Sequence, residues 1–204
     1  MAKALVIGNG ESRRDIDLEE YRTEYIFVGC NAIHRDTTVD YLVCCDRRMV
    51  EEATKNPDTA NTSIYVRPDW FNFFRKIQKR KNILTVPELP YQGNIKQDKP
   101  EHWGSGAYAV LVAANHFEEV TLLGFDLYPT NNKVNNIYKD TQNYSKSDAQ
   151  SVDYSFWVYQ IAMVFKHFPD TTFTILNTED WVMPKEWQRP NVNFKILNQL
   201  TVDL

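Results

Sequence analysis

The stretch Ala4-Leu5-Val6-Ile7-Gly8-Asn9-Gly10-Glu11-Ser12 decides the fold class. Its four apolar residues do not alternate with polar ones and are ended by a glycine, which is typical of a strand buried on both faces of a parallel sheet. Ligands of open α/β sheets bind outside the carboxyl ends of such strands. Here Asn9 and Ser12 are the first polar side chains, and Gly8 and Gly10 bring backbone N–H groups close to a ligand. The stretch predicts a ligand loop, with a simple tight turn as the alternative.

Composition and charge exclude several classes of protein. The chain has 204 residues, 43% of them hydrophobic, which predicts one folded domain over residues 1–204. A net charge of -4 does not favour a nucleic-acid partner. No apolar stretch approaches the roughly 20 residues of a membrane span, and the first apolar run is too short for a signal peptide. We therefore expect a soluble, cytoplasmic protein.

The cysteine pattern is also consistent with a cytoplasmic location. Cys30, Cys44 and Cys45 are an odd number, and two of them are adjacent, so they do not form a disulfide framework. No CxxC or HxxxH spacing accompanies them, which argues against a zinc site. The cysteine pattern indicates a reducing environment.

Apolar runs and helical patterns alternate along the chain. This order predicts an α/β fold with a mostly parallel sheet. The predicted strands are 4–7, 25–29, 41–45, 63–66, 83–86, 119–124 and 172–176, and the predicted helices are 15–21, 47–55, 70–80, 107–117 and 151–168. The polar segment 129–150 is predicted as a lid-like loop. The aromatic tail 181–204 is expected to pack back on the domain.

Cations gather at residues 75–81, in the last turns of the predicted helix 70–80. Positive charge at a helix C-terminus complements the helix dipole, so a solvated helix end is one interpretation. A landing patch for an acidic substrate is the alternative.

Three of the predicted strands end in a polar residue, namely Asn9, Asn31 and Asp46. The carboxyl ends of parallel strands share one edge, where a ligand site of this fold lies. Asparagine and aspartate are also favoured in ordinary turns at strand ends, which is the alternative. The repetition favours a site.

Gly104-Ser105-Gly106 precedes the predicted helix 107–117, which is apolar on nearly all sides and therefore buried. Ser105 can cap this helix, and the free N–H groups of a helix N-terminus favour an anion such as a phosphate. A simple serine cap between flexible glycines is the alternative. The next strand, 119–124, is followed by Phe125-Asp126-Leu127-Tyr128, which again places an acidic residue at a strand end.

Four short motifs, in this order, resemble those of the bacterial lipooligosaccharide sialyltransferases: Gly8-Asn9-Gly10-x-Ser12, Cys30-Asn31, Ser105-Gly106-x-Tyr108 and Gly124-Phe125-Asp126-Leu127-Tyr128. The resemblance covers residues 4–128. It implies a single-domain, Rossmann-like three-layer sandwich that uses CMP-sialic acid as donor and a glycan as acceptor. It also implies that no metal or other cofactor is required.

The resemblance assigns roles to particular residues. Asn9, Ser12 and Asn31 would contact the cytidine monophosphate part of the donor, and Ser105 and Gly106 its phosphate or sugar. Tyr128, and most plausibly Tyr138 in the following loop, would hydrogen-bond the departing phosphate. The full set of candidate nucleotide- or donor-binding residues is Gly8, Asn9, Gly10, Ser12, Asn31, Asp46, Gly104, Ser105 and Gly106.

The sequence departs from that family at two places. The family has an arginine three residues before the serine of its Ser-Gly motif, and His102 stands there in this chain. The family also has a general-base histidine after the lid, whereas residues 139–165 contain no histidine. A transferase needs a group that accepts the proton of the acceptor hydroxyl. His102 is the expected replacement and Asp126 the second candidate, while an ordinary loop histidine is the alternative for His102.

The sequence also resembles a second enzyme family. The archaeal-type 6-hydroxymethyl-dihydropterin pyrophosphokinases are similar at Val39-Asp40-Tyr41, leading to Asp46, and at Gly124-Phe125-Asp126-Leu127. Phosphoryl transfer of that type needs Mg²⁺. Asp46 and Asp126, at two strand ends, are suitable carboxylate ligands for it.

The leading expectation is a glycosyltransferase of sialyltransferase type. The alternatives are the Mg²⁺-dependent pyrophosphokinase and a non-catalytic nucleotide-binding or interaction protein that has lost its base. The sequence leaves open whether the protein is catalytically active and whether it forms a homo-oligomer.

Overall fold

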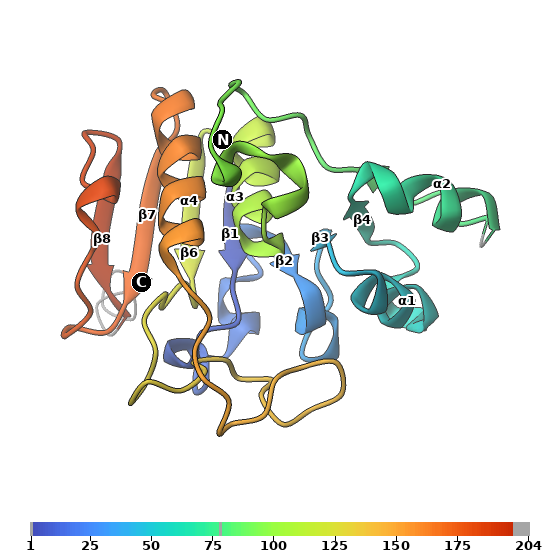
Figure 1. Cartoon of the computed structure of the whole chain (residues 1–204), viewed down its shortest axis with the longest axis horizontal. Coiled ribbons are helices and arrows are strands. Elements are labelled where there is room, and N and C mark those ends of the chain that lie inside the picture. The colour runs from blue at the N-terminus through green and yellow to red at the C-terminus, as the bar shows by residue number, and fades with distance from the viewer. Residues whose placement is uncertain (1, 78, 198–204) are drawn as a thin grey trace.

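The computed structural model describes residues 2–77 and 79–197, which form a single eight-stranded sheet (Figure 1). All neighbouring strands are parallel, in the order β5-β4-β3-β2-β1-β6-β7-β8. The strands are β1 (Lys3–Ile7), β2 (Tyr25–Cys30), β3 (Tyr41–Cys44), β4 (Ser63–Val66), β5 (Ile83–Thr85), β6 (Glu119–Leu123), β7 (Thr172–Asn177) and β8 (Val192–Ile196). The predicted α/β class, with its parallel sheet, is confirmed.

The order of the strands creates a switch point between β1 and β6. The chain builds the sheet outward from β1 to β5 and then returns to lay β6 against the other side of β1. Ile7 pairs with both Gly29 of β2 and Leu123 of β6, so these three strands end level with one another. Ligands of Rossmann-like sheets bind in the crevice at such a point.

Helices cover both faces of the sheet (Figure 1). α3 (Ser105–His116) and α4 (Ser155–His167) lie on the face to which Ala4 and Val6 point. α1 (Arg47–Lys55) and α2 (Pro68–Ile77), with short 3-10 helices, lie on the face to which Leu5 and Ile7 point. Because each strand is buried on both sides, its apolar residues need not alternate with polar ones. The result is the three-layer arrangement that the family resemblance implies.

Two elements differ from the prediction. Residues 15–21, predicted as a helix, hold only a 3-10 turn at Leu18–Tyr21, in which Leu18 is the one buried residue. A longer helix would need an apolar face to pack against the domain, and one buried side chain does not provide it. β8 lies in the tail and was not predicted, because its three central residues are exposed and the strand has no apolar run.

Within the described residues, Trp187 of the tail packs on the domain. Trp187 is fully buried, and its Nε1–H donates to the carbonyl oxygen of Val158 in α4 at 2.9 Å. Residues 198–204 of the predicted tail lie outside the described residues.

Two of the cations at the end of α2 make contacts that hold the fold together. The Arg80 guanidinium donates to the Thr59 carbonyl at 3.0 Å, and Arg75 donates to the Ile83 carbonyl at 3.4 Å. These contacts close the loops around the outer strands β4 and β5. We therefore favour the structural interpretation of this segment.

The 129–150 segment runs beneath the carboxyl ends of the strands, and the structure assigns it no helix or sheet strand (Figure 1). It is anchored at several points. Ile137 N–H donates to the Asn9 carbonyl at 2.9 Å, Arg35 donates to the Thr141 hydroxyl at 2.8 Å, and the Asn143 amide donates to Glu52 at 2.9 Å. The segment therefore closes the edge of the sheet where the candidate site lies.

No helix in the described part of the chain combines the length and apolarity that crossing a bilayer requires.

Candidate functional site

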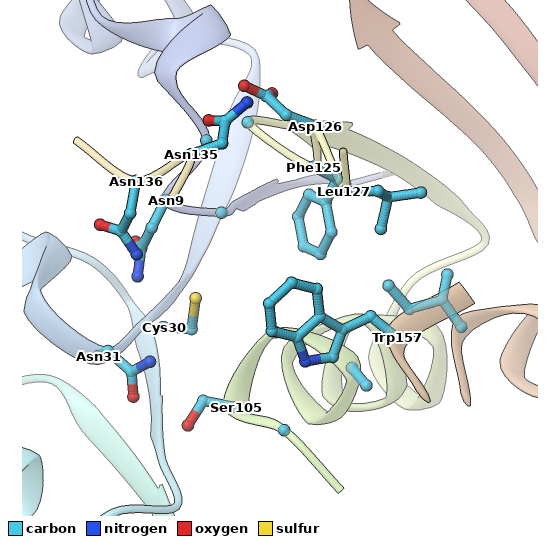
Figure 2. A pocket seen from close by; sticks show the side chains of 17 residues that line it. Asn9, Cys30, Asn31, Ser105, Phe125, Asp126, Leu127, Asn135, Asn136 and Trp157 are labelled. Carbon is cyan, nitrogen blue, oxygen red and sulfur yellow. The ribbon is translucent and has the colours of Figure 1, made fainter. Parts of the chain in front are cut away.

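A cavity of about 260 Å³ opens at the switch point between β1 and β6 (Figure 2). It lies between the strand ends, the beginning of α3, the first turn of α4 and the 129–150 segment. Eight of the residues predicted from the sequence line it: Gly8, Asn9, Gly10, Asn31, Gly104, Ser105, Gly106 and Asp126. The structure thus brings together segments separated by more than 100 residues.

The glycine corner has a different role from the one expected. Gly8 N–H donates to the Leu123 carbonyl and Gly10 N–H to the Gly124 carbonyl, both at 2.8 Å. These N–H groups are therefore used in joining β1 to β6 and are not offered to a ligand. A methyl group on Gly8 would collide with the Gly124 carbonyl oxygen, and one on Gly10 with the Asp126 carboxylate. The glycines permit close contact between two loops of the protein itself.

Two asparagines at adjacent strand ends line the cavity. Within residues 2–77 and 79–197, neither Asn9 Oδ1 nor Asn31 Oδ1 has a hydrogen-bond partner, although both atoms are buried. Figure 2 shows both side chains on the same side of the cavity. A buried polar atom without a partner is unfavourable by about 1–3 kcal/mol. A ligand with hydrogen-bond donors would remove that penalty.

The backbone conformation of Asn31 is consistent with a role in ligand binding. Its φ angle is 53°, a left-handed conformation that asparagine adopts more readily than most residues. Asn9 is held by its amide, which donates to the Tyr144 hydroxyl of the 129–150 segment at 3.2 Å. The Asn9 side chain is therefore held in place before a ligand arrives.

The N-terminus of α3 forms another wall. Gly104 is the N-cap residue and no side chain caps the helix. The Ser105 hydroxyl instead accepts a hydrogen bond from Cys45 N–H at 2.9 Å, so the predicted serine cap is wrong and Ser105 ties α3 to the end of β3. The first N–H groups of a helix lack partners within it and, with the helix dipole, favour an anion. Gly104 to Ala107 line the cavity at this helix end.

An apolar wall faces the asparagines. Figure 2 shows the rings of Phe125 and Trp157 across the cavity from Asn9 and Asn31. Trp157 lies on α4, within the predicted helix 151–168, and was not predicted as a site residue. Asn135 and Asn136, from the 129–150 segment, also line the cavity and were not predicted individually. Only the many asparagines of that segment could have suggested them.

Asp126 is the acidic group of the site. Both its carboxylate oxygens accept hydrogen bonds from Ser12: Oδ1 from the hydroxyl at 2.5 Å and Oδ2 from the backbone N–H at 2.9 Å. Its side chain is only 8% exposed. Among the described residues that line the cavity, Asp126 alone carries a carboxylate. Leu127, which follows it, has a φ of 64°, a strained conformation for leucine of the kind found at functional sites.

Five predicted site residues do not line this cavity, namely Ser12, Asp46, His102, Tyr128 and Tyr138. His102 is exposed, on the 3-10 turn Pro100–His102. Its backbone N–H donates to the Lys99 carbonyl and its carbonyl oxygen accepts from the Gln160 amide, both at 2.9 Å. Asp46 is the N-cap of α1, where its carboxylate accepts from Arg48 N–H at 2.8 Å. The expectations that His102 replaces the base and that Asp46 binds the donor receive no support from the geometry.

The two tyrosines predicted to hold the departing phosphate are also engaged elsewhere. The Tyr138 hydroxyl accepts from Arg13 at 2.8 Å and donates to Asp36 at 2.6 Å, on the α1 side of the sheet. The Tyr128 hydroxyl donates to the Val182 carbonyl at 2.8 Å and lines a neighbouring cavity. A different tyrosine, Tyr144, contacts one of the asparagines that line the first cavity, because its hydroxyl accepts from the Asn9 amide.

No three His, Cys, Asp or Glu side chains of the described residues are grouped so as to hold a metal ion. Asp46 and Asp126, the two carboxylates considered for Mg²⁺, do not line the same cavity.

We expect the cysteines to be unreactive in the folded protein, although Cys30 lines the cavity. Burial raises the thiol pKa values of Cys30 and Cys45 to about 12 and that of Cys44 well above its usual value. Since the thiolate is the reactive form, labelling with a disulfide reagent at neutral pH should be negligible for the native chain and complete in denaturant. Rapid labelling of one native thiol would contradict this.

The comparisons with known proteins add no relative: no family model, curated protein or solved structure matches the chain.

Proposed function

We propose that the protein is a glycosyltransferase of sialyltransferase type, which transfers a sugar from a CMP-activated donor to a glycan acceptor. The observation that carries this proposal is the pairing, in one cavity, of two unpartnered asparagine oxygens with the open N-terminus of α3. The first feature would be satisfied by hydrogen-bond donors on a ligand, and the second favours an anion.

A nucleoside phosphate carries both kinds of group. Its base and ribose offer amino and hydroxyl donors to Asn9 and Asn31, and its phosphate offers anionic oxygens to the N-terminus of α3. The rings of Phe125 and Trp157 supply a flat apolar surface for the base. Cytosine fits these acceptors through its amino group.

The reaction is a displacement at the anomeric carbon of the donor sugar. The oxygen of an acceptor hydroxyl forms a bond to that carbon as the bond from the carbon to the phosphate oxygen breaks. Asp126 accepts the hydroxyl proton, and the nucleoside monophosphate leaves with the bonding electrons. Negative charge grows on the phosphate, where the N–H groups and dipole of α3 stabilise it.

The pyrophosphokinase alternative gains no observation in its favour. It requires Asp46 and Asp126 to hold a metal ion together, and Asp46 instead caps α1 and pairs with Arg48 at 3.5 Å. The residues present do not fit the metal site of that reaction, and we derive no step through it.

The first test is nucleotide binding by thermal shift and calorimetry, with CMP, CDP, UDP, GDP and ATP, each with and without Mg²⁺. We expect CMP to bind whether or not Mg²⁺ is present, and the variant Asn31→Gly to bind CMP about 10-fold more weakly, since one hydrogen bond is lost. Glycine accepts the φ of 53° at this position, so the fold should be retained.

The outcomes separate the candidate functions. ATP binding that requires Mg²⁺ would favour the pyrophosphokinase. CMP binding without hydrolysis or transfer of CMP-sialic acid would favour a non-catalytic nucleotide-binding protein. Equal CMP affinity in the wild type and Asn31→Gly would show that this asparagine does not contact the nucleotide.

A further inference from the structure

A second cavity, of about 360 Å³, lies beside the first at the carboxyl ends of β6 and β7. The two cavities share Asp126 and Asn135 as lining residues. Its other lining residues include Glu11 and Ser12 of the first loop, Tyr128, and, at the end of β7 and just after it, Asn177, Asp180 and Trp181. The Asp126–Ser12 pair therefore stands at the boundary between two adjoining spaces.

The second cavity contains an unpartnered polar group of its own. Asn177, the last residue of β7, is 2% exposed. Its Oδ1 accepts from Thr178 N–H at 2.8 Å, whereas its Nδ2 has no partner among the described residues. The buried amide N–H groups lack an acceptor, and a hydroxyl or carbonyl oxygen of a ligand would supply one.

The rings and charges of the cavity narrow the class of ligand. Trp181 and Tyr128 form an aromatic wall, with ring centroids 6.3 Å apart. The acidic lining residues are Glu11, Asp126 and Asp180, and no lysine or arginine of the described residues lines the cavity. Glu11 is paired with Arg14 and with Lys139, both at 2.7 Å, so Asp126 and Asp180 are the acidic lining residues without an ion pair in the described part of the chain. An anionic ligand would be repelled. A neutral ligand with hydroxyl groups meets carboxylate acceptors, an amide donor and an aromatic surface, which suits a sugar.

We propose that this second cavity binds an uncharged sugar unit of the glycan acceptor. The inference rests on the proposed function, because it assigns the first cavity to the nucleotide donor. A sugar hydroxyl in the second cavity approaches Asp126 from one side while the donor occupies the other. The acceptor is therefore a neutral glycan terminus rather than a sialylated or phosphorylated one.

Each cavity holds a tryptophan, so fluorescence can report on the two sites separately. Trp157 lines the first cavity and Trp181 the second. We would titrate the full chain with CMP, with methyl galactoside as a neutral sugar and with galacturonate as its anionic counterpart. The same titrations would be made with Trp157→Phe and Trp181→Phe, which keep an aromatic ring at each position.

We expect methyl galactoside to change the wild-type fluorescence with a Kd on the order of 1 mM, as for a small neutral ligand. Trp181→Phe should lose that change and keep the response to CMP, and Trp157→Phe should show the opposite. Galacturonate should bind at least 10-fold more weakly. Asn177→Ala should weaken methyl galactoside binding about 10-fold.

The experiment can fail in two distinguishable ways. A CMP response at Trp157 without a sugar response at Trp181, or galacturonate binding as tight as that of methyl galactoside, overturns the inference and leaves the proposed function in place. A sugar response without any response to CMP contradicts the proposed donor and leaves the second cavity as a sugar site. The wild-type titration decides the matter even where Asn177→Ala does not fold.

Discussion

Replacing Asp126 by asparagine is expected to lower the rate of sugar transfer by about 10²–10⁴-fold, the usual contribution of a general base. The amide retains one oxygen that can accept from Ser12, so the loop keeps part of its anchoring. An amide cannot accept the proton of the acceptor hydroxyl. CMP affinity should therefore change little while turnover of CMP-sialic acid, with a neutral sugar as acceptor, falls.

The matched control is Asp170→Asn. Asp170 is an exposed aspartate in the turn before β7, at the edge of the sheet opposite the two cavities, so its replacement should leave the transfer rate unchanged. If Asp126→Asn transferred sugar at the wild-type rate, Asp126 would not be the base. His102→Ala would then test the remaining candidate.

The sheet could be predicted largely because its strands are buried on both faces. The apolar runs at Ala4–Ile7 and Tyr41–Cys44 have the continuous pattern that parallel, doubly covered strands require. That signal fails at the edge of the sheet. β8 is paired on one side, its central residues are exposed, and its sequence carries no apolar run.

The sequence predicts the site residues that lie at strand ends. It does not predict those whose position depends on how loops and helices pack in three dimensions. Asn9, Asn31 and Asp126 follow apolar strands, and the strand-end rule places all three at one edge. His102 is three residues from Ser105 in sequence, yet the intervening turn leaves its side chain exposed. Asn177 follows the predicted strand 172–176, so the same rule applied to it, but only the pairing of β7 with β6 shows that it lies beside Asp126.

The largest loss of stability is expected from Gly8→Ala. The added methyl group would collide with the Gly124 carbonyl oxygen and lie 3.1 Å from Phe125 Cδ2. That carbonyl accepts from Gly10 N–H at 2.8 Å, so it cannot turn away without breaking a link between β1 and β6. Overpacking of this kind is unfavourable by about 3 kcal/mol. For a chain of this size the melting temperature should fall by about 6–12 °C.

Gly106→Ala is the matched control for that change, since Gly106 belongs to the same cavity but has room for a methyl group. The nearest atom to its added Cβ would be Phe125 Cε1 at 3.5 Å, an ordinary contact. Gly106 lies in the first turn of α3, where alanine is the better helix former, so the variant should be no less stable than the wild type and more stable by at most about 1 kcal/mol. Denaturant unfolding of both variants measures the difference. If Gly8→Ala were as stable as Gly106→Ala, the two loops would have space to separate. The close contact between β1 and β6 would then not be what requires a glycine at position 8.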